Sequence, residues 1–422
     1  MSNMSSARPI RTTGRYLVLL PEDNVSSGIS ALTNATGARD IDDSAVSNLG
    51  VAVVTLDPNQ LQSLTTAVRG DAPMLAVEPE QIMYAITGNS ISTKTVSYLQ
   101  GYKDGVTNLV DGLKNGGVTV DQQQVTTANF VDGAATWGLQ ATKVVNSKYS
   151  GSGIKVAVLD TGLDLTHPDF GGRMITSKSF IPGEDVQDLH GHGTHCIGTS
   201  CGAKNPPDPS FPMRYGVAYD AEIFVGKVLS NEGYGADGGI LAAIDYAISS
   251  GCHIISMSLG ASTVVGTPFS PIYESIAKRA LNRGTLIIAA AGNESSRPSY
   301  ISPVGRPANC PSIMAVAALD SQLRVAYFSN GSINPDGGQI DIAAPGVDVY
   351  STWTTKAPSN PSRYLSINGT SMATPHVAGI AALYAEATGK RGLELWGLLM
   401  RDAQRLSLPS VDGGVGLVQA PI

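Results

Sequence analysis

The stretch that decides the fold runs from Asn368 to Gly379 and reads NGTSMATPHVAG. A glycine turn leads to Ser371, and beyond Pro375 apolar residues recur at helical spacing. Because proline is tolerated in the first turn of a helix, this stretch predicts Ser371 at the beginning of a buried helix. Backbone N–H groups at such a helix start favour negative charge. A serine is nevertheless a weak nucleophile unless a neighbouring base removes its proton.

Three further stretches offer the partners that such a serine needs. VAVLDTG (156–162) is an apolar strand that ends in Asp160 and a glycine turn, and HGHGTHC (190–196) opens a helix of small residues. LIIAAAGN (286–293) is a buried strand that ends in the side-chain amide of Asn293. The chain therefore carries an acid, an imidazole base and a hydrogen-bond donor for an oxyanion.

These motifs, in the order Asp, His, Ser, resemble those of the subtilisin-like serine proteases, the subtilases. The resemblance covers residues 137–422 and implies a serine endopeptidase made as a zymogen. It implies Ser371 as the nucleophile, His192 as the base and Asp160 as the residue that orients the imidazole. Asn293, with the backbone N–H of Ser371, would form the oxyanion hole. His192 takes the role of base because it is the first histidine of the His-Gly-Thr-His pattern.

Neighbouring residues of the same types leave other interpretations open. His195 is expected to be a hydrogen-bonded packing residue and His190 a loop residue. Three close histidines are also compatible with a metal site, but no Cys or Glu ligands accompany them at a suitable spacing. Asp164 and Asp169 follow Asp160, yet only Asp160 directly ends the strand.

The same resemblance implies where a substrate binds. The residues that match the walls of the primary specificity pocket are Ser258, Leu259, Gly260, Ala290, Ala291 and Gly292, with Gly305 at its base. Small residues leave a roomy apolar slot, so cleavage after a medium or large apolar residue is expected. Gly233, Tyr234 and Gly235 match an edge strand that pairs with the substrate backbone. Pro307 lies where the family has a cis proline.

Alternation of buried strands with helices predicts the fold class of residues 137–422. It is α/β, a doubly wound and mostly parallel sheet with helices on both faces. The predicted strands are Lys155–Leu159, Glu222–Lys227, His253–Met257, Thr285–Ala289 and Ser312–Ala317. The predicted helices are His192–Cys201, Asp237–Ser249, Pro271–Arg283, Thr370–Ala387 and Leu393–Asp402.

Residues 1–86 predict an N-terminal tail and a small domain of strands and helices, for which a resemblance to the subtilase propeptide implies an α+β, ferredoxin-like arrangement. Its expected elements are strands at Tyr16–Leu20, Val51–Leu56 and Met74–Pro79, a short helix at Ser26–Leu32 and a helix capped by Asp57 and Pro58. The domain resembles the inhibitory propeptide of subtilases, which makes the chain's own propeptide an intramolecular inhibitor. The alternative is an unrelated, permanent domain.

The resemblance places the tail Gln81–Ile86 along Gly233–Gly235, with Ile86 in the pocket above Gly305 and before the first cut. Residues 87–136 are expected to form a linker or an extra, partly helical segment, because apolar residues from Val96 to Leu113 recur at helical spacing among helix-weakening glycines.

Composition restricts the partners. The net charge of −7 gives no basic footprint for nucleic acid, and no apolar run is long enough to span a bilayer. Met1–Thr13 is polar and lacks the apolar centre of a secretory signal, although the resemblance favours a secreted protein. Polypeptide substrates and a monomer are expected.

The four cysteines show no paired spacing and are expected to be buried free thiols. Cys196, directly after His195, resembles the free thiol of the proteinase K and thermitase branches. The resemblance implies no cofactor for catalysis, and a structural Ca²⁺ for which Asp169 matches a family ligand. The loop that completes that site is replaced by residues 203–210, in which Asp208 could contribute an oxygen.

Two other functions compete with the protease. An esterase or acyltransferase could use the same triad, but the Gly-x-Ser-x-Gly elbow is absent at Ser371 and the triad order differs. A pseudoprotease acting as a binding module is disfavoured because Asp160, His192, Asn293 and Ser371 are all present.

Overall fold

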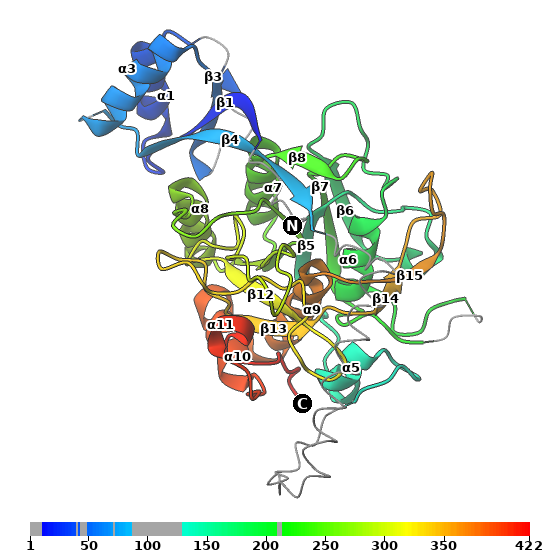
Figure 1. The fold of residues 1–422 in the computed structure, drawn as a ribbon. Coiled ribbons are helices and arrows are strands. Elements are labelled where there is room, and N and C mark those ends of the chain that lie inside the picture. Colours follow the sequence, from blue (N-terminus) through cyan, green and yellow to red (C-terminus); the bar gives the residue numbers. More distant parts are fainter. Residues whose placement is uncertain (1–10, 39–40, 43–48, 71, 87–128, 209–212) are drawn as a thin grey trace, which may run out of the picture.

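The computed structural model describes residues 11–38, 41–42, 49–70, 72–86, 129–208 and 213–422 (Figure 1). The helix predicted between Val96 and Leu113 lies outside these residues. The described chain forms a small N-terminal domain and a larger domain that carries all of the predicted site motifs.

A parallel sheet of seven strands forms the centre of the larger domain, in the order β13-β12-β11-β9-β5-β7-β6. The strands are β5 (Lys155–Asp160), β6 (Ile175–Ser179), β7 (Glu222–Lys227), β9 (Ile254–Met257), β11 (Leu286–Ala290), β12 (Met314–Leu319) and β13 (Ile342–Pro345). Except in the edge strand β6, which is largely exposed, their Val, Ile and Ala residues are buried on both faces, as expected of a parallel sheet covered by helices. The predicted fold class is confirmed.

Helices cover the two faces of this sheet in two groups. Helices α7 (Asp237–Ser249) and α8 (Pro271–Asn282) share a core with Leu159 of β5. Helices α6 (His192–Cys201), α9 (Thr370–Thr388) and α10 (Gly392–Asp402) share the other core with Val158. Successive strand residues point to opposite faces, so the apolar run of β5 supplies both cores.

The remaining elements of the larger domain are short. They are α5 (Trp137–Ala141), η1 (Val144–Asn146), η2 (Pro168–Phe170), α11 (Ser410–Gly413), β8 (Tyr234–Ala236), β10 (Leu259–Gly260) and the antiparallel pair β14 (Val349–Thr352) and β15 (Tyr364–Ile367). The predicted strands and helices of this domain agree with the structure to within two residues at each end. Strands β6, β13 and the β14–β15 pair were not predicted, since they contain few strongly apolar residues.

The N-terminal domain has the predicted α+β arrangement. Its elements are β1 (Thr12–Leu19), α1 (Val25–Thr36), β2 (Ile41–Asp42), β3 (Val51–Thr55), α3 (Pro58–Arg69) and β4 (Ala76–Ala85). The strands pair antiparallel in the order β4-β1-β3-β2, which is the ferredoxin-like order. Helix α3 begins with a capping box between Asp57 and Gln60.

The N-terminal sheet is apolar on both faces. Val18 and Val54 pack with α1 and α3, whereas Leu17, Leu19 and Val53 belong to the core that contains α7 and α8. The N-terminal domain therefore stacks its sheet on these two helices (Figure 1). Without the larger domain this second apolar face would be exposed to water.

Strand β4 joins the two domains and is longer than predicted. The predicted strand Met74–Pro79 and the predicted extended tail Gln81–Ile86 are largely one continuous element. Its first half pairs with β1 and its second half with β8 (Figure 1). On its other edge the second half also pairs with β10. Where the hydrogen bonds of β4 with β1 of the N-terminal domain end, hydrogen bonds with β8 and β10 of the larger domain begin, so β4 continues without a break.

Candidate active site

Strand β5 and helix α6 bring Asp160 and His192 together. His192 Nδ1 lies 2.7 Å from Asp160 Oδ1, and both side chains are buried. Gly191 turns the chain into α6 at φ +105°, and a Cβ there would lie 2.4 Å from the Trp353 ring, so glycine is required. Burial opposes charge on His192, but the neighbouring Asp160 carboxylate outweighs it and raises the pKa of His192 well above its usual value.

The other two histidines do not join His192 in a metal site. His195 Nε2 contacts the carbonyl oxygens of Val349 and Leu365, at 3.0 and 3.1 Å, and burial lowers its pKa to about 3. His195 is thus the hydrogen-bonded packing residue that was predicted. Among the described residues, the one group with metal-ligand spacing is Asp160, His192 and Cys196, which consists of the proposed acid, the base and the thiol beneath them.

His190 is a loop residue, as predicted, and it lies close to His192. Its ring centroid is 6.2 Å from that of His192, and its Nε2 is 2.9 Å from where a Cβ on Gly233 would stand. Burial, followed by the charge of His192, lowers the pKa of His190. His190 therefore lies between the base and the strand that binds β4.

Helix α9 places Ser371 next to α6. The Ser371 carbonyl oxygen accepts hydrogen bonds from Ser258 Oγ at 2.8 Å and from the Cys196 thiol at 3.6 Å, and that sulfur also lies 3.9 Å from His192 Nδ1. The Ser371 hydroxyl donates to the Ser258 carbonyl at 3.0 Å, and His192 Nε2 has no hydrogen-bond partner. A turn of the hydroxyl toward His192 is therefore needed before proton transfer.

The thiol of Cys196 is not a rival nucleophile. The residue is fully buried, and burial raises its pKa, whereas the reactive form of cysteine is the thiolate. All four cysteines are buried and free, as predicted.

Asn293, directly beyond β11, is held in one orientation by Thr370. Its Oδ1 accepts hydrogen bonds from the Thr370 backbone N–H and hydroxyl, both at 2.9 Å. The amide Nδ2 is thereby directed into the site, where it donates to the carbonyl oxygen of Ile86 at 3.2 Å. This is the contact that an oxyanion donor makes with a substrate carbonyl.

The end of β4 lies across the site as a peptide between two strands. Met83 pairs with Gly235 and Tyr84 with Tyr234, which confirms the predicted pairing with residues 233–235. On the other side Ala85 pairs with Leu259. Beyond the strand, the Ile86 N–H donates to the Ser258 carbonyl at 3.3 Å.

The side chain of Ile86 is 7% exposed and lies beside Gly260, one of the residues predicted to form the pocket. Its Cδ1 lies 3.0 Å from where a Cβ on Gly260 would stand, so the missing side chain at 260 makes room for it. The Gly305 N–H donates to the carbonyl oxygen of Ala291 at 2.9 Å, and Ala291 and Gly292 directly follow Ala290, the last residue of β11. The Arg306–Pro307 peptide bond is cis, as the resemblance implied.

Two polar residues that organise the site escaped sequence analysis. Buried Asp188 accepts hydrogen bonds from the backbone N–H groups of His190, Gly191 and Thr194, and so fixes the start of α6. Thr370 orients Asn293 as described above. Asp188 lies three residues before Gly191, the N-cap of α6, so the usual capping pattern does not identify it from sequence.

The surroundings of Asp169 do not fit a calcium ion. Its two carboxylate oxygens accept hydrogen bonds from Tyr215 and, at 2.8 Å, from Tyr364, and His167 Nδ1 lies 3.6 Å away. Asp208 instead pairs with Arg363 at 2.7 Å. Calcium takes about six to eight oxygen ligands, and neutral tyrosine hydroxyls that already donate to the carboxylate supply them poorly.

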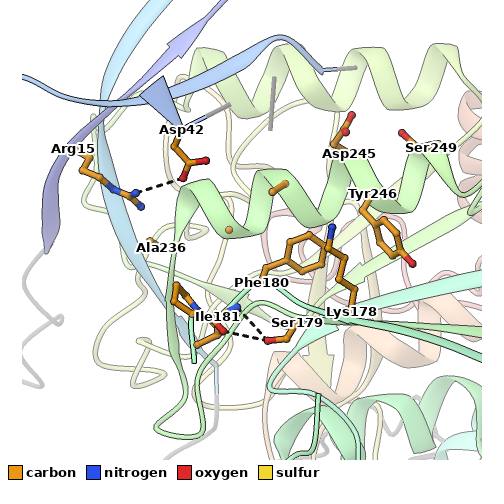
Figure 2. A pocket seen from close by; sticks show the side chains of 13 residues that line it. Arg15, Asp42, Lys178, Ser179, Phe180, Ile181, Ala236, Asp245, Tyr246 and Ser249 are labelled. Atoms are coloured by element: carbon orange, nitrogen blue, oxygen red, sulfur yellow. Dashed lines mark hydrogen bonds and ion pairs between the residues drawn. The ribbon is translucent and has the colours of Figure 1, made fainter. Parts of the chain in front are cut away.

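A cavity of about 650 Å³ lies at the interface between the two domains (Figure 2), and its lining does not include Asp160, His192 or Ser371. Arg15 and Asp42 line it from the N-terminal side, and Lys178 stands over the rings of Phe180 and Tyr246 at 5.0 and 5.1 Å. Because both domains line this cavity, its walls exist only while the domains are assembled.

Comparison with known proteins agrees with this geometry. Residues 151–417 match the Subtilase family. The chain is 42% identical over 251 residues to Subtilisin BL of Lederbergia lenta, covering 58% of this chain and 82% of that protein. It is 40% identical over 247 residues to Subtilisin E of Bacillus subtilis (strain 168), covering 58% of each protein. It is 36% identical over 257 residues to the Thermophilic serine proteinase of Bacillus sp. (strain AK1), covering 61% of this chain and 58% of that protein.

The fold and the site thus define a serine endopeptidase of the hydrolase class. The chain belongs to the subtilase family. Within the described part of the chain, no helix combines the length and the apolar character that crossing a membrane would require.

Proposed function

We propose that the chain cleaves polypeptides with Ser371 as nucleophile, His192 as general base and Asp160 as the group that holds the imidazole. The single observation that carries this proposal is the hydrogen bond from Asn293 to the Ile86 carbonyl, made by a peptide already aligned across the site. The 2.7 Å contact between Asp160 and His192 supports the same assignment, since it leaves Nε2 of the imidazole to receive a proton.

The reaction follows from these positions. The hydroxyl of Ser371 turns from the Ser258 carbonyl to His192 Nε2, which takes its proton while Oγ bonds to the substrate carbonyl carbon. The carbonyl oxygen gains the negative charge, and Asn293 Nδ2 stabilises it. His192 then gives its proton to the leaving amine, which leaves an ester on Ser371. A water molecule, deprotonated by His192, hydrolyses the ester and restores the serine.

Residues 1–86 act in this proposal as an intramolecular inhibitor. Strand β4 occupies the substrate position through pairing with β8 and β10, and Ile86 fills the pocket at Gly260. The enzyme would cut first after Ile86, and it would prefer other substrates with a medium or large apolar residue at that position. The contacts of Leu17, Leu19 and Val53 with the core of α7 and α8 favour this role over a domain packed elsewhere.

Three further assignments rest on the family alone. They are polypeptide substrates encountered outside the cell, a monomeric enzyme, and a catalytic reaction that needs no cofactor. Fractionation of cells that produce the chain, followed by an activity assay of each fraction, tests the first of them.

Labelling with a fluorophosphonate tests the nucleophile. The full chain, allowed to process itself, is expected to carry one label on Ser371, located by mass spectrometry. Ser371→Ala is expected to abolish both labelling and self-processing, whereas Ser299→Ala, at an exposed serine, is a matched control that leaves both intact. Self-processing by purified Ser371→Ala would remove Ser371 as nucleophile.

A further inference from the structure

Strand β4 makes a second set of contacts with the larger domain, far from the pocket of Ile86. Two acidic side chains, Glu78 and Glu80, point toward the starts of α7 and α8. Glu78 stands eight residues before Ile86, which is about 26 Å along an extended strand. The side chains that Glu78 reaches, those of Arg306 and Ser270, are not among the residues predicted to form the primary specificity pocket, although the Arg306 carbonyl lies beside Gly260.

The two carboxylates differ in where their charge is balanced. Glu80 bonds to Arg15 Nε at 2.7 Å and to Thr13, both in its own domain, as well as to the Gly238 N–H at 3.0 Å. Glu78 receives hydrogen bonds from Arg306, at 3.1 and 3.4 Å, and from the Ser270 hydroxyl. Both of these partners of Glu78 belong to the larger domain. Glu78 is therefore the acidic residue of β4 that the larger domain itself recognises.

Two groups of the larger domain, Asp237 and Tyr273, hold Arg306 in addition to Glu78. Its Nη2 lies 2.9 Å from Asp237 Oδ2, and its guanidinium stands over the Tyr273 ring at 5.1 Å from the centroid. Burial raises the pKa of Asp237 to about 6 in spite of Arg306, so the carboxylate is anionic at neutral pH and anchors the cation. Arg306 is 7% exposed, and its Nε has no hydrogen-bond partner. Asp237 and Tyr273 therefore hold the guanidinium beside the place that Glu78 occupies.

Between Arg306 and the pocket, β4 is bound through its main chain. The Gln81 N–H donates to Asp237 Oδ2 at 2.8 Å, whatever the side chain at that position. From Ile82 onward the backbone pairs with β8. In an extended substrate that follows the same path, one residue takes the place of Ile86 and its carbonyl faces Asn293. The side chain eight residues before it then lies at Arg306.

We propose that Arg306, assisted by Ser270, is an exosite for an acidic residue in extended polypeptide substrates. The inference rests on the proposed function, because it assumes that substrates follow the path of β4. It makes Arg306 a specificity determinant that favours a Glu or Asp eight residues before the apolar residue at the cut. Short peptides that end before this position cannot use it.

The test compares peptides on the full chain after it has processed itself. The first probe is a quenched fluorescent peptide with the sequence of residues 78–86 and a short C-terminal extension, and the second has Gln in place of the Glu at the first position. The KM of the Glu peptide is expected to be about tenfold lower, which is the effect typical of one charge-assisted hydrogen bond. The kcat of the two peptides should agree. Moving the Glu by one residue turns it to the other face of the strand and should remove the advantage.

A variant separates the exosite from the rest of the enzyme. In Arg306→Met the Glu and Gln peptides should have equal KM values, and Ser270→Ala should reduce the difference between them. A peptide of only residues 83–86 plus the extension reports on the pocket without the exosite. If that short peptide is cleaved while wild-type enzyme does not distinguish Glu from Gln, the exosite is excluded and the proposed function stands. If no peptide is cleaved, the proposed function itself fails.

Discussion

The side-chain amide of Asn293 donates a hydrogen bond to the carbonyl oxygen of Ile86, a residue 207 positions earlier in the chain. Thr370 holds the other end of that amide through two hydrogen bonds. The carbonyl of a bound peptide is therefore met by a donor whose orientation is set before binding, which is what stabilisation of an oxyanion requires.

Asn293→Ala should lower kcat for peptide hydrolysis by roughly 10²–10³ and leave KM nearly unchanged. This magnitude is the one that removal of an oxyanion donor has in a subtilisin. Thr370→Val, which removes the hydroxyl that orients Asn293, should lower kcat by a smaller factor. Steady-state kinetics with one short peptide measures both. A large rise in KM at constant kcat would contradict the assigned role.

Hydrolysis should require His192 to be neutral. Asp160 raises the pKa of His192 above the ordinary 6.5, so the imidazolium persists to higher pH and activity should increase as pH rises through the raised pKa. Any stability gained from the charged pair has the opposite dependence: it is present below pH 6.5 and is lost as pH rises through the folded pKa.

A pH–rate profile checks the titration of His192. His195, whose pKa is about 3, should not contribute a step between pH 5 and 9. Asp160→Asn should shift the midpoint of the profile to lower pH as well as reduce the rate. An unchanged midpoint in Asp160→Asn would mean that another group controls the profile.

Replacing Ile86 tests the inhibitory segment. Ile86→Asp puts a charge into the apolar space at Gly260 and should slow self-processing of the full chain by at least tenfold, because burying an unpaired charge is costly. Ile86→Leu, of equal volume, should process almost normally. Gel analysis of processing over time, with the new terminus identified by sequencing, follows both. Equal rates for the two variants would remove Ile86 from the pocket.

The buried cluster around Asp169 should contribute to stability without calcium. Tyr364→Phe removes the hydroxyl that donates to Asp169 and should lower the free energy of unfolding by about 1–3 kcal/mol. A chelator should leave the melting temperature of the wild-type chain unchanged, as measured by thermal unfolding with and without added Ca²⁺. A chelator-dependent fall that disappears in Asp169→Asn would restore the calcium site that the sequence predicted.

Sequence patterns predicted most of the larger domain because its strands and helices are long and buried. The apolar run before Asp160 and the motif around Ser371 each lie where regular structure begins or ends, so that local pattern and site coincide. The predicted strand Met74–Pro79 coincides with the first half of β4, but the prediction ended too early. The second half of β4 is stabilised by pairing with β8 and β10 rather than by its own sequence pattern.

Other features depend on contacts that no local pattern contains. The hydrogen bonds of the Tyr215 and Tyr364 hydroxyls to Asp169 join residues from three separate segments. The ion pairs of Arg306 with Asp237 and Glu78 likewise join distant parts of the chain. Sequence analysis identified Asp169 by resemblance and missed the tyrosines, whose spacing carries no signal.

The path of β4 through both domains has a consequence for the timing of activation. Before the chain is cut, the N-terminal segment that occupies the site is tethered, so its effective concentration there is set by the linker and does not change on dilution. After a cut at Ile86 the same segment becomes a separate molecule whose occupancy follows mass action. Concentrated samples of the processed protein would then stay inactive, and dilute samples would become active.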